Sequence, residues 1–348
     1  MGHVVSVDDK VFGRLLQDFY QVMKLEKQAD ASVLAKTVDE MRKGIGSQEA
    51  LITSDLLIIR YKLMLDEVMA AERLMNQFEA QGRELFRHNI YLYHYFKGQI
   101  SSRKKKWKEA ICFYEQAESY LTEEEEKADF YYKLANAYYQ TCIPALSALN
   151  TTKALHFAEH HQQRLHVAKC KLLLGLNYLE VRNFEQAEYC MQDVLECQPD
   201  ELSLGLTAMV HHNLGLLYFV QHKFETAISF FEKAVHAEPK THYLKSLYYL
   251  AESLFRANQT QEAIRYYRLG FVRSKKVEDT NYQWAFAMLH KQFIDHDNFE
   301  AVWTRGISYY ESNGDRYSVH YYSLRLAEYY TFKGEEEKAN HYYQLAVR

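Results

Sequence analysis

The first 75 residues carry apolar side chains at the spacing of amphipathic helices. Each predicted helix has one apolar and one polar face, so the helices must pack on one another to bury their apolar faces. The pattern predicts a three-helix bundle over residues 1–75, with helices at about 7–25, 31–44 and 48–75. A linker or connecting helix is expected over 76–90, before a longer array over 91–348.

Several residues mark the start of the third predicted helix. Gly44 and Gly46 separate it from the second helix, because glycine readily ends a helix. Ser47 is a typical N-cap residue, which makes Gln48 the first helical position. The apolar stripe that follows begins at Leu51 and is wide enough to pack on two partners.

The rest of the chain repeats itself. The segment LLLGLNYLEVRNFEQAEYCMQDVLECQP, ending at Pro199, aligns with HNLGLLYFVQHKFETAISFFEKAVHAEP, ending at Pro239. Both carry Leu-Gly-x-x-Tyr, then Ala, then an aromatic or large residue, then Pro, which is the tetratricopeptide pattern. We expect Gly and Ala where two antiparallel helices touch, Tyr and Phe in the seam between them, and Pro ending the second helix.

Weaker copies extend this pattern from about residue 85 to the end, with a degenerate copy over 283–312. No such repeat buries its apolar face alone, so each needs its neighbours. The sequence therefore predicts an all-α fold, in which the bundle is followed by a right-handed superhelix of about seven tetratricopeptide repeats.

Composition supports this prediction. The 348 residues are 48% apolar, which rules out a mostly disordered chain. Only 13 Gly and 3 Pro occur, too few for the turns of a β-sandwich or a doubly wound sheet. A net charge of −4 argues against a dominant nucleic-acid footprint. No run of 18 apolar residues and no secretory signal is visible, and five cysteines without a CxxC pair suggest buried thiols in a reducing cytoplasm.

Few motifs suggest catalysis. The chain has no phosphate-cradling glycine-rich loop and no GxSxG elbow. His156, Glu159 and His160 match the reversed zinc motif HxxEH, but no third ligand supports them, so we interpret them as the polar outer face of a helix. We expect no metal and no cofactor.

A basic run, Arg103 to Lys106 followed by Trp107 and Lys108, lies between the paired helices of the first repeat. It is either a contact for an acidic partner or a phosphate, or a solvated loop, and we favour the solvated loop.

The inner face of such an array is lined by fixed positions of each first helix and is usually its binding face. The amide of Asn213 suits a peptide backbone, and Glu180 and Glu252 suit a basic side chain. Aromatic side chains add apolar contact. The sequence predicts a peptide groove whose inward residues include Asn136, Tyr139, Leu176, Glu180, Asn213, Leu216, Phe219, Lys245, Tyr248, Glu252, Phe255, Arg325 and Glu328.

A three-helix bundle followed by such repeats, in about this length, resembles the Rap family. These are response-regulator aspartate phosphatases and related regulators of Gram-positive bacteria, which short Phr pheromone peptides control. The likeness covers nearly the whole chain and is sharpest at residues 60–66, 127–139 and 257–263.

In Rap phosphatases, a Gln at the start of the third bundle helix is thought to position the water that attacks the receiver's aspartyl phosphate. The resemblance places Gln48 there as the candidate catalytic residue, because an amide can accept from water and donate to a phosphoryl oxygen. Family phosphatases tend to carry acids just before this Gln and often one at Asn136, where this chain has none. The resemblance makes Gln48, Leu51 and Asn136 candidate partner-binding residues, and an ordinary exposed helix start stays open for Gln48.

Peptide sensing carries over from the family more closely. The family holds a pheromone arginine with an acid of the third repeat, and Glu180 matches that position, with Asn177 one turn earlier. Asn213 matches the groove asparagine of the next repeat. The resemblance thus implies a short, secreted and reimported Phr-type peptide as the ligand.

Two functions stay open, and both share peptide control. In the first, the peptide-free bundle binds and sequesters a DNA-binding transcription regulator. In the second, Gln48 promotes hydrolysis of a response regulator's aspartyl phosphate. We favour the first because the acids near Gln48 are missing. Direct DNA binding is disfavoured, since residues 1–75 show no basic recognition helix, while the surplus of aromatic residues leaves room for a homo-oligomer.

Overall fold

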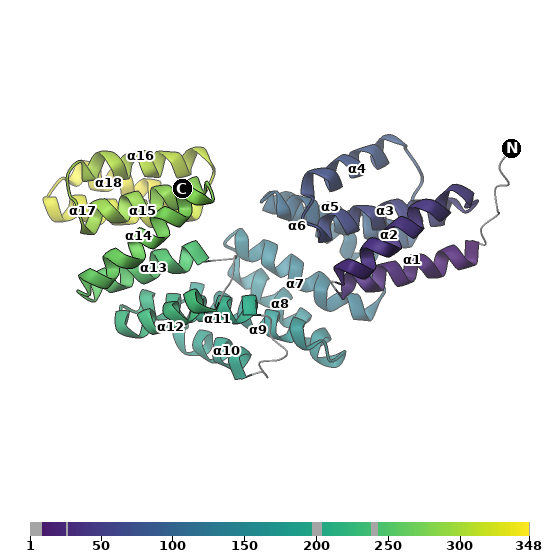
Figure 1. Cartoon of the computed structure of the whole chain (residues 1–348), viewed down its shortest axis with the longest axis horizontal. Coiled ribbons are helices and arrows are strands. Elements are labelled where there is room, and N and C mark those ends of the chain that lie inside the picture. Colours follow the sequence, from purple (N-terminus) through teal and green to yellow (C-terminus); the bar gives the residue numbers. More distant parts are fainter. Residues whose placement is uncertain (1–8, 26, 197–203, 238–242, 348) are drawn as a thin grey trace. The chain divides into compact units, whose positions relative to one another are not determined.

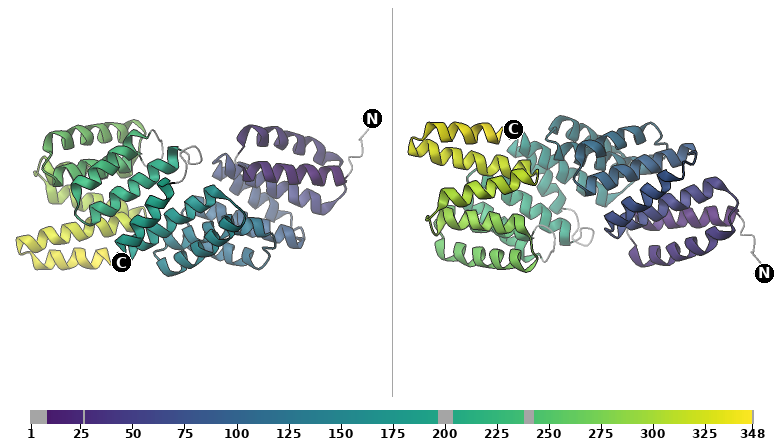
Figure 2. Two further views of the ribbon diagram at one scale, coloured as in Figure 1. Left: turned by 90° about the horizontal axis from the view of Figure 1, so that it is seen from below. Right: turned by 90° about the horizontal axis from the view of Figure 1, so that it is seen from above.

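The computed structural model of the chain describes residues 9–25, 27–196, 204–237 and 243–347 (Figure 1). All regular structure in these residues is helical. The chain divides into two compact units, Met1–Cys190 and Met191–Arg348. Within each unit, consecutive helices lie side by side in both views of Figure 2.

The first unit begins with the helices that the sequence assigns to a bundle. These are α1 (Asp9–Lys24), α2 (Gln28–Met41), the short 3₁₀ helix η1 (Arg42–Gly44), α3 (Gln48–Met64) and α4 (Val68–Ala80). Helix pairs follow: α5 (Arg87–Arg103) with α6 (Trp107–Glu118), α7 (Glu124–Gln140) with α8 (Pro144–His160), and then α9 (Arg164–Glu180). Helix α10 (Phe184–Glu196) carries the chain from one unit to the next.

The second unit continues the helix pairs. It contains α11 (Leu204–Val220), α12 (Phe224–His236), α13 (Tyr243–Arg256), α14 (Thr260–Lys276), α15 (Thr280–Phe293), α16 (Phe299–Ser312), α17 (Arg316–Lys333) and α18 (Glu336–Ala346). The degenerate copy expected over 283–312 is the pair α15 and α16. The tetratricopeptide-like helix pairs that the sequence predicts are therefore present.

The predicted helix over 48–75 is wrong in one respect, because it is two helices. The chain turns after α3 at Asp66, whose φ of 61° lies in the left-handed region that ends a helix. An aspartate tolerates this conformation better than most residues, because its short side chain can bond locally. Helix α4 then runs to Ala80 and α5 starts at Arg87, so the expected linker over 76–90 is reduced to the residues between them.

The bundle and the first helix pairs share one hydrophobic core. Buried side chains of the bundle, such as Phe19 and Leu56, belong to the same cluster as Phe96 of α5 and Phe130 of α7. Helix α3 packs directly on α5. The structure therefore places the bundle and these repeats in one compact unit, since neither buries its apolar face alone.

The close helix contacts expected at the repeat glycines are confirmed. A Cβ built at Gly98 would lie 2.5 Å from the ring of Tyr114, and one at Gly215 would lie 2.7 Å from Phe231. An aromatic ring of the second helix thus fills the seam against the glycine of the first helix. The helix-ending roles predicted for Pro199 and Pro239 lie outside the described residues.

Tight turns join most of these helices without glycine. The second turn residue adopts a left-handed φ of 53–61° in the series Lys105, Cys142, Gln162, Arg182, His222, Asn258 and Glu278. Left-handed residues other than glycine cost conformational free energy, which the packing of each helix pair must offset. This use of ordinary residues in turns explains how a chain with so few glycines reverses so often.

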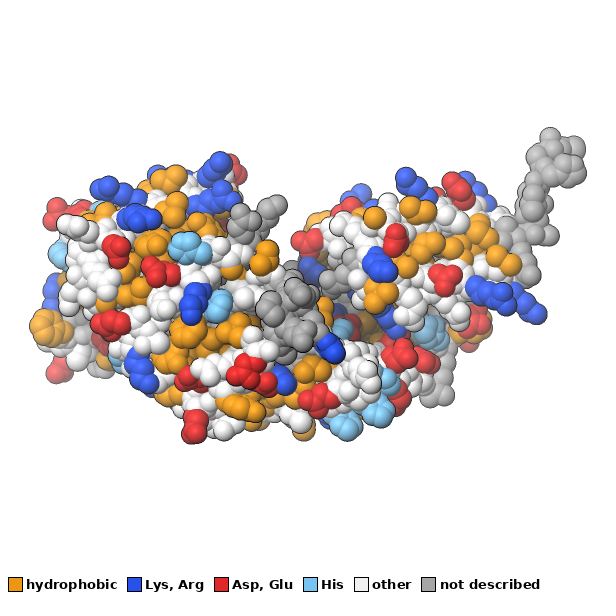
Figure 3. Space-filling view, turned by 60° about the horizontal axis from the view of Figure 1, so that its bottom comes forward, with side chains coloured by type: hydrophobic (Ala, Val, Ile, Leu, Met, Phe, Trp, Pro, Cys, Tyr) orange, Lys and Arg blue, Asp and Glu red, His pale blue; other side chains and the backbone are white. Residues whose placement is uncertain are grey.

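Two remaining expectations concern membrane-spanning helices and the burial of the cysteines. No helix among the described residues is both long and apolar enough to cross a membrane. The expectation that the cysteines are buried is wrong for Cys112 and Cys142, which are exposed, whereas Cys170 is buried. Cys197 lies outside the described residues. On the face shown in Figure 3, basic and acidic side chains are interspersed, and neither sign dominates.

Candidate functional site

The start of α3 has the geometry that the sequence predicts. The helix begins at Gln48, and the backbone N–H of Ala50 donates to the Ser47 hydroxyl oxygen at 3.3 Å. Ser47 is therefore the N-cap, and the Gln48 side chain is exposed at the first helical position. Leu51, one turn on, is half-buried.

Two sets of contacts fix this helix start to its surroundings. The fully buried Asn89 of α5 accepts a hydrogen bond from the Thr53 hydroxyl at 3.0 Å, and its amide nitrogen lies 3.5 Å from the Glu49 carbonyl oxygen. Further along α3, both carboxylate oxygens of Asp55 pair at 2.5 Å, one with Arg42 and the other with Arg83. Helix α3 thus presents Gln48 from a rigid support.

The third predicted partner-binding residue, Asn136, is not brought to Gln48. Asn136 shares a cavity with Met64, at the opposite end of α3. Gln48 and Met64 are sixteen residues apart on one helix, which corresponds to about 24 Å. Asn136 therefore belongs to the inner face of the repeats and not to the exposed start of α3.

The inner face of the first unit contains an exposed acid. Glu180, at the end of α9, accepts a hydrogen bond from the Tyr139 hydroxyl at 3.3 Å and is otherwise open to solvent. One turn earlier, buried Asn177 donates through its amide nitrogen to the Leu173 carbonyl at 2.8 Å. The Asn177 side-chain oxygen has no hydrogen-bond partner. The Asn177 side-chain oxygen is therefore an unpaired acceptor, and the exposed Glu180 carboxylate can accept further hydrogen bonds.

The inner face of the second unit contains residues of two kinds. The first kind keeps polar atoms available: Asn213 makes no hydrogen bond with another described residue, although only 7% of it is exposed. Leu216 and Lys245 are partly exposed, and burial lowers the pKa of Lys245, with Asp315 acting in the opposite direction. These residues stay candidates for peptide contact.

The second kind is taken up by the core. Phe219, Tyr248 and Phe255 are all buried, and Phe255 stacks on Phe293 with ring centroids 4.8 Å apart. The Tyr248 ring packs edge-on against Phe286 of α15, with ring centroids 5.9 Å apart. In this structure the three aromatic side chains pack between helices and do not line an open groove.

Glu252 also has partners within the chain. It is fully buried and accepts from Arg256 Nε at 2.9 Å and from the Tyr321 hydroxyl at 3.0 Å, while Arg325 Nη1 lies 2.5 Å from its carboxylate. Burial alone would raise the pKa of Glu252, but Arg325 and Arg256 outweigh it and hold that pKa below its ordinary value. We call Glu252, Arg256, Tyr321 and Arg325 the Glu252 cluster. The cluster joins α13 to α17. Glu252, which the sequence predicts to bind a basic side chain of a peptide, is therefore already paired within the chain.

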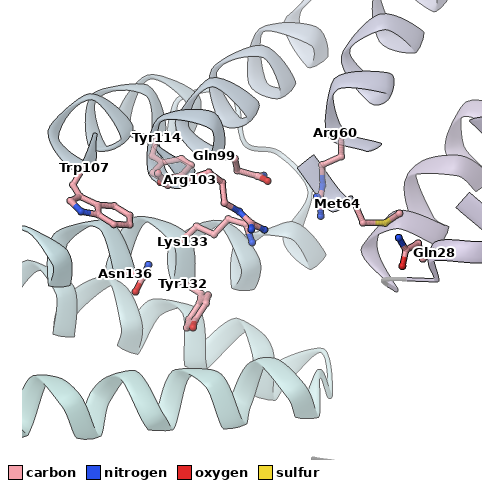
Figure 4. A pocket seen from close by; sticks show the side chains of 11 residues that line it. Gln28, Arg60, Met64, Gln99, Arg103, Trp107, Tyr114, Tyr132, Lys133 and Asn136 are labelled. Atoms are coloured by element: carbon pink, nitrogen blue, oxygen red, sulfur yellow. Dashed lines mark hydrogen bonds between the residues drawn. The ribbon is translucent and has the colours of Figure 1, made fainter. Parts of the chain in front are cut away.

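A cavity of about 510 Å³ lies in the first unit, between the bundle and the helices α5, α6 and α7 (Figure 4). Arg60 of α3, Arg103 of α5 and Lys133 of α7 extend into it from different helices (Figure 4). We call it the basic cavity, and its lining is Gln28, Arg60, Met64, Gln99, Ser102, Arg103, Trp107, Tyr114, Tyr132, Lys133 and Asn136. Of these, Asn136, Arg103 and Trp107 are singled out by the sequence, but Arg60 and Lys133 are not, because nothing local shows that they converge.

A neighbouring cavity of about 440 Å³ shares Arg60, Tyr132 and Lys133 with the basic cavity, and it also contains Asp129. Asp129 pairs with Lys133 at 2.6 Å and lies 3.4 Å from His166 Nε2. Burial by itself would raise the pKa of Asp129, but Lys133 and His166 together hold it well below its usual range. Asp129 therefore stays charged and compensates Lys133 on that side.

Metal binding finds no support among the described residues. His156 and His160 are exposed on α8, and no group of three His, Cys, Asp or Glu side chains there is arranged to hold a metal ion. The HxxEH residues belong to the outer face of a helix.

Comparison with known proteins gives one consistent result. No family model matches the chain. It is 27% identical to the regulatory protein RapC of Bacillus subtilis (strain 168), over 93% of this chain and 90% of RapC. It is 25% identical to response regulator aspartate phosphatase I of the same organism, over 95% of this chain and 88% of that protein.

A solved structure shows the same fold. The crystal structure of a Rap protein complexed with competence and sporulation factor matches with a TM-score of 0.86 and 20% identity, over 98% of this chain and 97% of that one. Sequence likeness along nearly the whole chain thus agrees with the arrangement of its helices. Along nearly its whole length the chain is therefore similar to the Rap regulatory proteins and response regulator aspartate phosphatases, and it shares the fold of a solved Rap protein.

Proposed function

We propose that the chain is a cytoplasmic, peptide-controlled regulator of the Rap type. A short Phr-type peptide binds on the inner face of the helix pairs. In the absence of the peptide, the N-terminal helices bind and sequester a DNA-binding transcription regulator. Peptide binding shifts the population toward a state that releases this partner.

One observation carries the proposal: the bundle shares its hydrophobic core with the first helix pairs, while the start of α3 stays exposed. A ligand on α5, α7 or α9 therefore acts on the same packed body that presents Gln48 and Leu51. The unpaired side-chain oxygen of Asn177 and the exposed carboxylate of Glu180, both on α9, support a peptide as that ligand. The solved Rap protein of the same fold is itself complexed with competence and sporulation factor.

Partner capture tests this proposal. The tagged full chain is incubated with the cytoplasm of its source bacterium, and bound proteins are identified by mass spectrometry with and without a pool of random pentapeptides. We expect a DNA-binding regulator that the peptides release. If no peptide in the pool changes what is captured, peptide control is contradicted.

The alternative function, phosphatase activity, rests on the exposed amide of Gln48 at the capped start of α3. Under our proposal the chain does not hydrolyse an aspartyl phosphate, so Gln48→Ala has no effect on that reaction. Neither protein then speeds the loss of aspartyl phosphate from a captured, phosphorylated receiver. The measurement is the rate of that loss, with Gln81→Ala, at an exposed position after α4, as the control.

The opposite result would favour the enzyme. If the unaltered chain and Gln81→Ala accelerate dephosphorylation while Gln48→Ala loses about 100-fold or more of that acceleration, Gln48 is catalytic. The sequestration proposal would then give way to the phosphatase.

Glu180 provides a test of the peptide face. Glu180→Gln keeps an oxygen for the Tyr139 hydroxyl but removes the charge, so affinity for arginine-containing pentapeptides should fall about 10- to 100-fold. Binding is compared for an arginine-containing pool and the same pool with glutamine in place of arginine. Glu185→Gln, an exposed acid on α10, serves as the matched control. An unchanged preference for arginine in Glu180→Gln would remove Glu180 from the site.

A further inference from the structure

The charge in the basic cavity is one-sided. Three of its lining residues, Arg60, Arg103 and Lys133, are cationic, and none of the lining residues is acidic. Arg103 has its ion-pair partner, Asp66, outside the cavity at 2.6 Å, and Asp66 is largely exposed to solvent. Such exposed pairs contribute little and leave the positive charge available.

Arg60 lacks an ion-pair partner among the described residues, although it also lines the neighbouring cavity that contains Glu125, Glu126 and Asp129. It makes no hydrogen bond or ion pair with any described residue, although it is half-buried between the bundle and the repeats. It also acts on Lys133: burial lowers the pKa of Lys133, Asp129 raises it, and the nearby charge of Arg60 lowers it again. A partly buried guanidinium without a partner loses solvation that a bound anion would restore.

One neutral polar group of the cavity is a donor without an acceptor. Gln99 of α5 is only 7% exposed, and its amide nitrogen is buried without a hydrogen-bond partner. Its side chain extends into the cavity (Figure 4). A buried donor without an acceptor is unfavourable, so this group indicates a ligand with an acceptor oxygen.

The cavity is larger than an inorganic ion needs. At about 510 Å³ it has room for a peptide residue, and Trp107 and Tyr132 provide aromatic walls beside the cations. Lys133 and Asn136 stand one turn apart on α7, whose position 136 is one of the predicted inward sites of the array. The cavity therefore lies on the face that peptide control requires.

We propose that the basic cavity is an anion subsite that binds a carboxylate of the regulatory peptide, held by Arg60, Arg103 and Lys133 and by the Gln99 amide. This inference rests on the proposed peptide control and names the chemistry that the peptide must bring. A planar carboxylate accepts from a guanidinium in a fork and from an amide without any covalent step.

The subsite also couples the peptide to the bundle. Arg60 belongs to α3, which presents Gln48, whereas Arg103 and Lys133 belong to α5 and α7. A carboxylate bound among them contacts both the bundle and the repeats, so it stabilises the arrangement in which these three cations converge. The charge of the peptide thereby acts on the surface that contacts the partner.

The test uses two pools of random pentapeptides, one with free C-terminal carboxylates and one with C-terminal amides. The full chain is equilibrated with both pools, and bound peptides are counted by mass spectrometry. We expect about tenfold or greater preference for the free carboxylates. Arg60→Gln and Arg103→Gln should each reduce that preference to near unity, and Arg73→Gln, at an exposed position on α4, should keep it.

Each other outcome is decisive. If amidated peptides bind only when they contain Asp or Glu, and Arg60→Gln abolishes this selection, the carboxylate comes from a side chain and the subsite stands. If peptides bind with no carboxylate preference, or with a preference that both arginine variants retain, the subsite is refuted. If inorganic phosphate competes at the cavity while peptides show no preference, the ligand is free phosphate and the proposal fails. If neither pool binds, peptide control itself fails.

A folding control keeps the result interpretable. Arg60 has no internal partner to lose, and Arg103 loses only an exposed ion pair, so both variants should keep the melting temperature of the parent within a few degrees. Two variants with different surroundings make a common loss of carboxylate preference attributable to the cavity.

Discussion

Replacing Arg325 by methionine is expected to destabilise the second unit by about 3 kcal/mol. Methionine has a similar length but cannot pair with Glu252, whose side chain is fully buried. Arg256 and the Tyr321 hydroxyl would remain as partners, but the 2.5 Å ion pair from α17 would be lost. Removing one member of a buried ion pair leaves a desolvated charge, which is costly because water cannot reach it.

Urea unfolding at neutral pH measures the loss, and hydrogen exchange of α13 and α17 amides locates it. Lys333→Met, on the same helix, breaks an exposed ion pair with Glu300 and an exposed cation–π contact with Tyr329, so it should cost much less than Arg325→Met. The double change Glu252→Met with Arg325→Met should recover part of the loss, because it leaves no acid unpaired. Equal effects of Arg325→Met and Lys333→Met would show that the Glu252 cluster does not hold α13 to α17.

The same variant carries a pH signature. In the parent, the lowered pKa of Glu252 contributes stability above the ordinary glutamate value of 4.5, and this contribution is lost as the pH falls below it. Without Arg325, burial acts against the charged form, and protonation relieves the strain. The difference in the free energy of unfolding between parent and variant should therefore narrow as the pH falls below 4.5. A difference that is constant with pH would assign the loss to packing alone.

Gly270→Ala is expected to destabilise the second unit by about 2–3 kcal/mol. A Cβ at this position of α14 would lie 2.1 Å from the ring of Phe286, which is fully buried. The ring cannot move away easily, because the rings of Tyr248 and Tyr267 pack edge-on against it, with centroids 5.9 and 6.1 Å from its own. Overpacking of a filled seam forces α14 and α15 apart.

Gly13→Ala is the matched control, because Gly13 also lies inside a helix but has open space around its Cβ position. That change should stabilise the chain by about 0.5–1 kcal/mol, since alanine is the better helix former. Both are measured by urea unfolding. If both variants gain stability, the seam at Gly270 is not as tightly packed as the structure shows.

Local sequence was sufficient for the helices and for the start of α3. Ser47 and Gln48 form a cap and a first helical residue through contacts within a few residues, so nothing distant is needed to place them. The glycines of the repeats were equally informative, because a glycine opposite an aromatic residue reports a close helix contact at a fixed spacing. The break at Asp66 was missed, because a single aspartate within an apolar pattern does not reveal a left-handed φ.

The sequence predicted which residues of the inner face point toward one another, but not which of them are already paired or buried. Glu252 and Arg325 were both assigned inward positions, and in the structure they do face each other. Their mutual pairing, and the burial of Tyr248 and Phe255, depend on how closely α13 approaches α17 and α15. Repeat spacing gives the direction of a side chain but not the distance to a helix many residues away.

By itself, the sequence determined the helices, the repeated helix pairs, the exposed amide of Gln48 and the resemblance to the Rap family, because each depends on short spacings or on likeness along the chain. Only the tertiary structure decided that the bundle and first repeats share a core, that Glu252 is already paired, and that Arg60, Arg103 and Lys133 converge on one cavity. Those features depend on residues far apart in sequence, and the packing of apolar faces is what brings their charges together.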